Sequence, residues 1–155
     1  ILFSKLKCNY LCIKLNKKIM YPEEMVKPMR AELSEAGFQD LYTAEAVENA
    51  LKNEGTTLLV VNSVCGCAAR NARPGAKMSL DNAQKPNQLV TVFAGVDREA
   101  VDAARQHMFP FPPSSPCMAL FKNGELVHML ERHHIEGRPA ELIAENLQDA
   151  FNEYC

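Results

Sequence analysis

The chain has 155 residues, of which 47% are hydrophobic and 23% charged, and this length suits one compact domain but is short for two. Outside the first 19 residues there are twelve basic side chains against nineteen acidic ones, a balance that excludes a strongly basic nucleic-acid surface. Apolar runs such as residues 58–61 fall far short of the roughly 20 residues of a transmembrane helix. We therefore expect neither nucleic acid nor a membrane as a partner.

Residues 1–19 contain five lysines and no acidic residue. They lack the uninterrupted apolar segment and the small-residue cleavage site of a secretory signal. We predict that Met20 is the natural start, that residues 1–19 are a non-native or disordered leader, and that residues 20–155 form a single domain. Without a secretory signal we expect a cytoplasmic location, where disulfides are usually transient, catalytic or sensing.

The first elements are predicted to be helices. Apolar residues recur at three- and four-residue spacing over residues 21–36, which predicts a helix that Pro22 opens and that Pro28 kinks or splits. Thr43 is a candidate N-cap for a second helix over residues 44–53.

An apolar, β-branched run over residues 57–64 predicts a buried strand. A helix is expected to begin near Gly66, and Pro74 with Gly75 should bend or interrupt it. This order places the intervening segment at a strand-to-helix junction.

Residues 89–94 predict the next strand, and Asp97 is expected to cap a helix over residues 98–107 with its carboxylate. Four prolines lie in residues 109–116. Because proline fixes φ and restricts the residue before it, this segment is predicted to be a stiff loop.

The pair Asn123-Gly124 separates two apolar runs, which predicts a β-hairpin. Pro139 then opens an amphipathic helix whose expected apolar face consists of Leu142, Ile143, Leu147 and Phe151. The whole pattern predicts an α/β fold, with a central mixed sheet and helices on both faces.

Cys65-Gly66-Cys67, the CGC pair, directly follows the buried strand. A helix N-terminus at this point would favour thiolate over thiol. A disulfide needs Cα atoms roughly 4.4 to 6.8 Å apart, close to the roughly 6.6 Å of an extended strand, so we expect Gly66 to supply a permissive turn. Such a small ring should be easily reduced. Asn62 and Ser63 could hydrogen-bond the turn or simply support it.

Cys65 is the candidate attacking thiolate because it lies nearer the turn, and Cys67 would then resolve the mixed disulfide. Arg70 and Arg73 could add positive potential. They fit equally well as solvated charges on a helix surface.

Other cysteines and histidines leave alternatives open. Cys117 could be a third thiol near the CGC pair, but a small buried strand residue is favoured. The same three cysteines could instead hold zinc or an iron-sulfur centre. Cys155 is either inert or a second resolving or intermolecular thiol. His133 and His134 are expected at the surface, because adjacent strand residues do not easily direct both rings at one metal.

The chain also resembles known redox proteins. Residues 115–125 (SPCMALFKNGE) look like the cis-proline strand and hairpin of thioredoxins. Three further segments resemble the bacilliredoxin family, and the likeness runs over residues 21–155: VVNSVCGCAA at residues 60–69, TVFAG at 91–95 and FPPSSP at 111–116. The resemblance implies a thioredoxin-like fold and a cis bond before Pro116, although only roughly 5–6% of X-Pro bonds are cis.

The resemblance further implies that Cys65 removes bacillithiol from S-bacillithiolated proteins, with Cys67 in the resolving position and Pro116 facing the thiols. A monothiol cycle, in which free bacillithiol releases the enzyme, stays open. Bacillithiol would be a co-substrate and no cofactor would be bound. The expected partners are S-bacillithiolated or disulfide-bonded client proteins and a low-molecular-weight thiol. The alternatives are a protein disulfide oxidase or isomerase using the same pair, or the metal scaffold.

Overall fold

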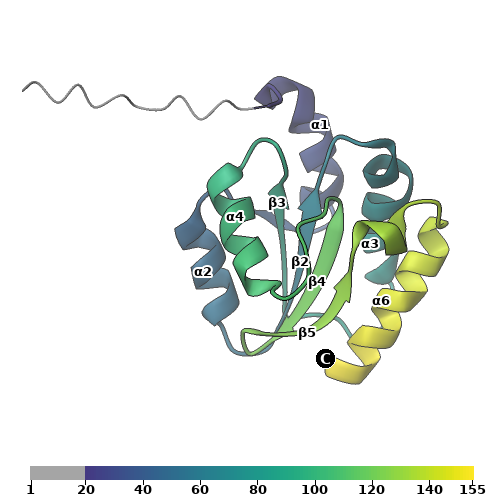
Figure 1. The fold of residues 1–155 in the computed structure, drawn as a ribbon. Coiled ribbons are helices and arrows are strands. Elements are labelled where there is room, and N and C mark those ends of the chain that lie inside the picture. Colours follow the sequence, from purple (N-terminus) through teal and green to yellow (C-terminus); the bar gives the residue numbers. More distant parts are fainter. Residues whose placement is uncertain (1–19) are drawn as a thin grey trace, which may run out of the picture.

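The computed structural model describes residues 20–155, which form a five-stranded mixed sheet in the order β1-β3-β2-β4-β5 (Figure 1). Strand β4 runs antiparallel to both of its neighbours, whereas β1, β3 and β2 are parallel. The strands are β1 (Gln39–Asp40), β2 (Thr56–Asn62), β3 (Gln88–Phe93), β4 (Cys117–Lys122) and β5 (Glu125–Leu130). The leader predicted over residues 1–19 lies outside the described residues.

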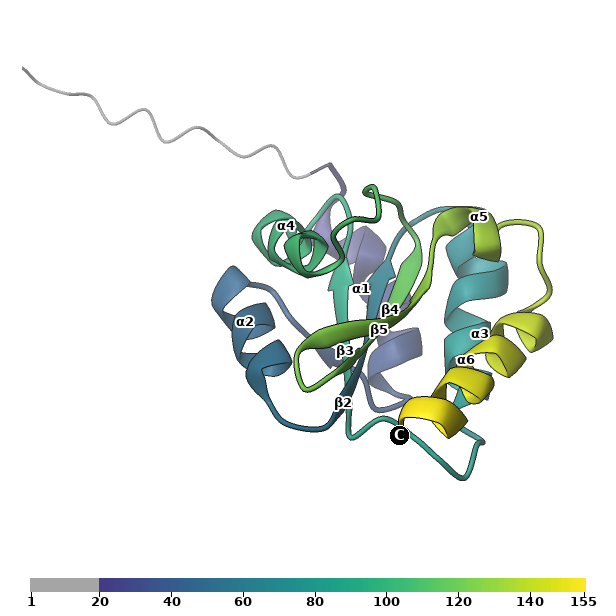
Figure 2. The ribbon, with the colours of Figure 1, turned by 60° about the horizontal axis from the view of Figure 1, so that its bottom comes forward.

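Helices cover both faces of this sheet, α2 and α4 on one side and α3 and α6 on the other (Figures 1 and 2). The helices are α1 (Glu23–Ser34), α2 (Ala44–Lys52), η1 (Ala68–Ala72), α3 (Arg73–Ser79), α4 (Arg98–His107), α5 (Arg132–Ile135) and α6 (Ala140–Tyr154). The predicted α/β fold is confirmed. Within residues 20–155, every helix falls short of the length and apolarity that crossing a bilayer would take.

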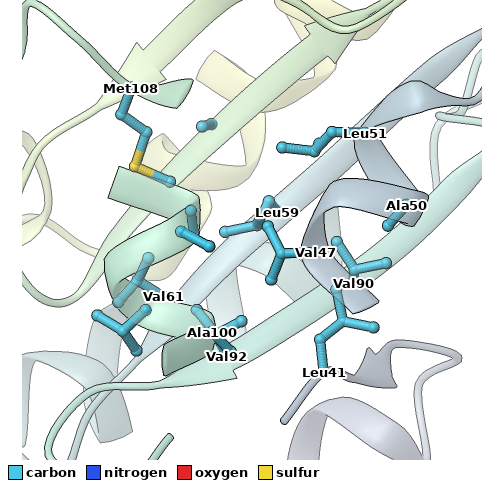
Figure 3. Packing of buried hydrophobic residues seen from close by; sticks show 14 of the residues in the cluster. Leu41, Val47, Ala50, Leu51, Leu59, Val61, Val90, Val92, Ala100 and Met108 are labelled. Atoms are coloured by element: carbon cyan, nitrogen blue, oxygen red, sulfur yellow. The ribbon is translucent and has the colours of Figure 1, made fainter. Parts of the chain in front are cut away.

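The described residues pack into two apolar clusters, one on each side of the sheet. Strand β2 contributes to both because successive side chains point to opposite faces. Its Leu59 and Val61 pack with α2 and α4 (Figure 3), while Leu58 and Val60 pack with α3 and α6. All seven residues of β2 are buried, so the end of this strand is a rigid support for whatever follows it.

The first two helices begin where the sequence predicts. Pro22 is the N-cap of α1 rather than its first residue, and the helix continues through Pro28 without being split. Thr43 caps α2 as expected, with its hydroxyl accepting the Ala46 amide at 3.1 Å.

The predicted carboxylate cap of α4 is wrong. Asp97 occupies the N-cap position, but its side chain makes no capping bond. The carboxylate instead accepts two bonds from the Arg30 guanidinium, both 2.7 Å, and one from the Phe93 amide at 2.9 Å. A buried guanidinium is a stronger partner for a carboxylate than a helix amide.

The hairpin is confirmed, with φ of 51° at Asn123 and 82° at Gly124. The prediction that Leu142 belongs to the buried apolar face of α6 is wrong, since its side chain is 49% exposed. The buried face of α6 consists of Ile143, Ala144, Leu147, Ala150 and Phe151.

The helix after the CGC pair is continuous over residues 66–79, with the π turn η1 before α3. Pro74 has no amide hydrogen to donate to the carbonyl of Arg70, and the wider π turn accommodates that missing bond. Gly75 does not interrupt α3. A Cβ there would lie 2.7 Å from Cγ2 of Ile143, so Gly75 lets α3 and α6 pack closely.

Candidate functional site

The CGC pair lies at the predicted junction between β2 and a helix. The carbonyl of Cys65 accepts the amides of Ala68 at 3.0 Å and Ala69 at 3.2 Å, so the helical stretch begins directly after Cys65. The partial positive charge of a helix N-terminus favours a thiolate at this place.

Cys65 and Cys67 are joined in a disulfide, with their Cα atoms 5.4 Å apart. The expectation that Gly66 provides an unusual backbone conformation is wrong. Its φ is not positive, and a Cβ added to it would meet no heavy atom within 4 Å. The ordinary first turn of a helix brings the Cα atoms of Cys65 and Cys67 together. Most residue types can adopt this backbone conformation.

Ser63 contacts the first cysteine directly, since its Oγ lies 3.2 Å from Sγ of Cys65. The backbone beneath is fixed by Asn62, whose Oδ1 accepts the Ser63 amide at 2.9 Å and whose Nδ2 donates to the Met29 carbonyl at 3.2 Å. The sequence placed Asn62 and Ser63 beside the turn but did not reveal the contact with sulfur. In the reduced protein a hydroxyl donating to Cys65 would favour the thiolate.

Arg73 lies beneath the site and is only 2% exposed. Its guanidinium donates to Oδ1 of Asn62 and to the Ser63 carbonyl, both at 3.0 Å, and to Oε2 of Glu32 at 2.8 Å. Of the two alternatives for Arg73, a solvated surface charge is therefore wrong. Arg70, which is exposed, fits that description.

Pro116 and Ser115 approach the same end of the sheet. Cys117 pairs with Val61 across β4 and β2, so the two residues before Cys117 continue toward the end of β2. The bond between Ser115 and Pro116 is cis, as the resemblance to thioredoxins implied. Ser115 and Cys65 line one cavity, which places the proline loop beside the first cysteine.

Two cavities open at Cys65. The arginine groove, about 490 Å³, is lined by both cysteines and by Arg70, Arg132 and Arg138. The strand-end groove, about 320 Å³, is formed by the ends of the strands and the proline loop: its lining includes Tyr21, Ser63, Val64, Cys65, Ala94, Gly95, Arg105, Ser115 and Arg132. Cys65 lines both grooves, whereas Cys67 lines the arginine groove.

Cys117 is buried in β4 with 1% exposure, as the favoured interpretation expected. Burial raises the pKa of its thiol to about 12, and the opposing effects of Arg105 and Ser114 are smaller. Cys155 is exposed at the end of α6. That helix has 15 residues and starts beside Pro139 of the arginine groove, so Cys155 lies about 22 Å from Pro139, at the end of α6 remote from the groove that Cys65 lines.

The metal alternative is not supported. Among residues 20–155, the group whose ligand atoms could surround one ion is Glu131 with His133 and His134, and it contains no cysteine. These rings lie in α5 rather than on a strand, with centroids 3.9 Å apart, so the expectation that they cannot approach one point is wrong.

The approach of these rings has a structural cause. Nδ1 of His134 accepts the Glu131 amide at 3.1 Å, as part of a capping box at α5. A neutral imidazole has one nitrogen lone pair that can accept a hydrogen bond, and in His134 the bond from the Glu131 amide occupies it. Burial and the neighbouring His133 also lower the pKa of His134.

The geometry agrees with the relatives of this sequence. A family model described as Disulphide isomerase matches residues 21–155. A bacilliredoxin of Cytophaga hutchinsonii is 58% identical over 134 residues, which cover 86% of this chain and 99% of that protein. The chain belongs to the bacilliredoxin family. A second bacilliredoxin, from Halalkalibacterium halodurans, is 52% identical over 136 residues, covering 87% of this chain and 94% of its own length.

Solved structures establish the bacilliredoxin fold of this chain as thioredoxin-like. Oxidised mitochondrial thioredoxin 3 of Saccharomyces cerevisiae superposes with a TM-score of 0.54 at 15% identity, covering 79% of this chain and 98% of that one. Thioredoxin from Trypanosoma brucei brucei gives 0.53 at 18% identity, covering 76% and 93%. Family and fold together make the protein a thiol-disulfide oxidoreductase, which acts on disulfide-bonded or thiol-modified proteins.

Proposed function

We propose that this bacilliredoxin-family protein removes bacillithiol from S-bacillithiolated client proteins in the cytoplasm. Bacillithiol is the co-substrate, and the exchange uses no bound cofactor. The observation that carries the proposal is the position of Cys65, which lines both grooves while its sulfur contacts Ser63 at a helix N-terminus. A mixed disulfide between a protein and a small thiol has two unequal halves, and both need space beside the attacking sulfur.

The exchange proceeds in two balanced steps. The Cys65 thiolate attacks the bacillithiol sulfur of the mixed disulfide, and the client leaves as a thiolate that takes up a proton. The Cys67 thiolate then attacks the Cys65 sulfur, bacillithiol leaves, and the Cys65–Cys67 disulfide forms. The client disulfide has gained two electrons and the CGC pair has lost two. Two further molecules of a low-molecular-weight thiol reduce the pair and leave as their own disulfide.

The surrounding residues suit these steps. The helix N-terminus favours the thiolate at Cys65, and Ser63 can donate to it. The buried Arg73 holds Asn62 and the Ser63 carbonyl in place beneath the site. Pro116 closes the loop that borders the strand-end groove, and we assign it a positioning role for the client beside Cys65. The monothiol cycle remains an alternative, in which a free bacillithiol attacks the adduct in place of Cys67.

A second candidate is oxidation or isomerisation of protein disulfides by the same pair. The oxidised CGC pair and the family description favour it as an alternative. Supplying a scrambled disulfide protein and an S-bacillithiolated protein to the same preparation separates the two activities. Faster turnover of the scrambled protein would favour the isomerase.

Substitution of the cysteines tests the main proposal. Cys65→Ser should lower the release of bacillithiol from a model client at least about 100-fold, because the nucleophile is gone. Cys67→Ser should accumulate bacillithiol on Cys65, seen as a mass increase of the intact protein. Cys155→Ser, at the exposed far end of α6, is the matched control and should keep the full rate. Undiminished release by Cys65→Ser would refute the assignment.

A further inference from the structure

The arginine groove contains more positive than negative charge. Three arginines and one acidic residue, Glu136, contribute to its lining. Arg132 is paired with Glu136 at 3.2 Å. Among residues 20–155, the guanidinium groups of Arg70 and Arg138 have no hydrogen-bond or ion-pair partner. Two cations beside the disulfide are therefore available to a ligand.

These two arginines come from segments that are tied together. Arg70 and Asn71 belong to η1, and Arg138 precedes α6. The side-chain amide of Asn71 donates to the backbone carbonyl of Arg138, which links the two walls of the groove. The backbone positions from which the two arginine side chains extend are thus linked to each other.

The two grooves at Cys65 differ in what they can accept. The strand-end groove includes Tyr21, Val64 and Ala94 and runs along the ends of extended segments, which suits a stretch of client chain. The arginine groove has few apolar side chains, and Arg70 and Arg138 line it together with both cysteines. Guanidinium groups bind carboxylates through paired, charge-assisted hydrogen bonds.

We infer that the arginine groove is the binding site for the small-thiol half of the mixed disulfide, and that Arg70 and Arg138 bind carboxylates on it. The inference rests on the proposed exchange at Cys65 and assigns to Arg70 and Arg138 the recognition of the small thiol by its negative charge. After the first exchange the small thiol is attached to Cys65 and remains in this groove. Cys67, which lines the same groove, is then beside the bond that it must attack.

A series of small thiols that differ in charge tests this site. One client protein is prepared as its mixed disulfide with mercaptosuccinate, a dicarboxylate, with uncharged 2-mercaptoethanol, and with cationic cysteamine. The wild-type protein should release mercaptosuccinate with the highest kcat/KM and cysteamine with the lowest. This preference should weaken as ionic strength rises, because both arginines are exposed.

The double variant Arg70→Gln with Arg138→Gln should reduce the preference for mercaptosuccinate over 2-mercaptoethanol by about 10- to 100-fold. The ratio is the decisive quantity, because any change in the Cys65 thiolate affects all three substrates alike. Arg98→Gln, on the exposed surface of α4, is the matched control and should leave the ratio unchanged. Circular dichroism checks that each variant is folded.

Two results would overturn the inference. If the double variant slows all three substrates equally, the arginines act on Cys65 in general and bind no carboxylate. If the ratio stays at the wild-type value, the small thiol does not occupy this groove, while the exchange at Cys65 stands. The proposed function fails separately, and the inference with it, if the wild type releases none of these thiols and no bacillithiol.

Discussion

Cys117 and Cys65 lie at the same end of the sheet, but their surroundings give the two thiols opposite properties. Cys65 follows β2 at a helix N-terminus and borders two grooves. Cys117 is enclosed in the core, where burial disfavours the thiolate and raises its pKa to about 12. Disulfide exchange needs a thiolate, so Cys117 is excluded from it near neutral pH.

The raised pKa of Cys117 has a consequence for stability at alkaline pH. Below about pH 8.5 this thiol is protonated in both the folded and the unfolded chain. Above that pH the unfolded chain loses the proton while the folded chain keeps it, so the free energy of unfolding falls until about pH 12. Between pH 8.5 and 10 the wild type should lose about 1.5 kcal/mol more than Cys117→Ala.

Urea unfolding of the oxidised protein at several pH values measures this difference, since the CGC pair then does not titrate. The tyrosines and lysines titrate in both proteins and cancel in the comparison. Parallel pH profiles for the wild type and Cys117→Ala would show that Cys117 does not keep its proton in the folded state.

The contacts of Arg73 show where a sequence pattern misleads. Arg70 and Arg73 are three residues apart, which in an α-helix places both on one face. Arg70 lies within the π turn η1 and Arg73 begins α3, which breaks this relation, so Arg70 is exposed while Arg73 is buried against Asn62 and Ser63. A π turn has no strong sequence pattern, although Pro74, which cannot donate a backbone hydrogen bond, indicates an irregular turn just before it.

Two glycines in the helical stretch after β2 have different roles. Gly75 is packed against α6, where a Cβ would lie 2.7 Å from Ile143, whereas Gly66 faces open space. Gly75→Ala should therefore lower the free energy of unfolding by about 1–3 kcal/mol through overpacking. Gly66→Ala should be neutral or should raise it by up to about 1 kcal/mol, because alanine loses less backbone entropy on folding.

Chemical denaturation of the two variants gives this comparison directly, with each serving as the control for the other. A loss of stability in Gly66→Ala as large as that in Gly75→Ala would mean that the CGC turn needs a glycine after all. Equal stability of both variants would contradict the close packing of α3 on α6.

The strands and the hairpin were predictable because their signals are local. Runs of β-branched residues mark β2 and β3, and the pair Asn123-Gly124 marks the turn between β4 and β5. That the Asp97 carboxylate binds elsewhere instead of capping α4 could not be predicted in the same way. The partner that engages Asp97 is Arg30, which is 67 residues away in the sequence.

Arg30 connects the two helical layers of the protein. It belongs to α1, which packs with the α3 and α6 cluster through Leu33, while Asp97 begins α4 of the opposite cluster. Their side chains are each 5% exposed, and the Arg30 guanidinium also contacts the Tyr42 and Phe93 rings. Burial by itself would lower the pKa of Arg30, but Asp97 and Glu23 together outweigh it and raise the pKa, so Arg30 stays charged.

Asp97→Asn should lower the free energy of unfolding by about 3 kcal/mol, because a buried cation loses its main counter-charge. The matched control is Asp102→Asn, whose partner Arg98 lies 3.8 Å away on an exposed surface, and it should cost less than about 0.5 kcal/mol. Urea unfolding of both variants measures the difference. Similar small effects in the two would show that the Arg30 pair contributes little to holding the layers together.

The sequence predicted the α/β class, the mixed sheet and the place of the CGC pair, because these depend on hydrophobic periodicity and chain order. The two grooves were not predictable. They are formed by segments that meet only in the folded chain: η1 with the approach to α6, and the end of β2 with the proline loop. The contact of Ser63 with Cys65 depends on one rotamer, which no spacing rule specifies.

Cys155 offers a practical consequence of the length of α6. It is the exposed free cysteine of residues 20–155, and it lies at the opposite end of that helix from the arginine groove. With the CGC pair oxidised and Cys8 and Cys12 replaced by serine, a maleimide dye or a resin linker would attach at Cys155. The protein could then be immobilised with its exchange face directed into solution, and reduction of the CGC pair would make the bound protein ready for exchange.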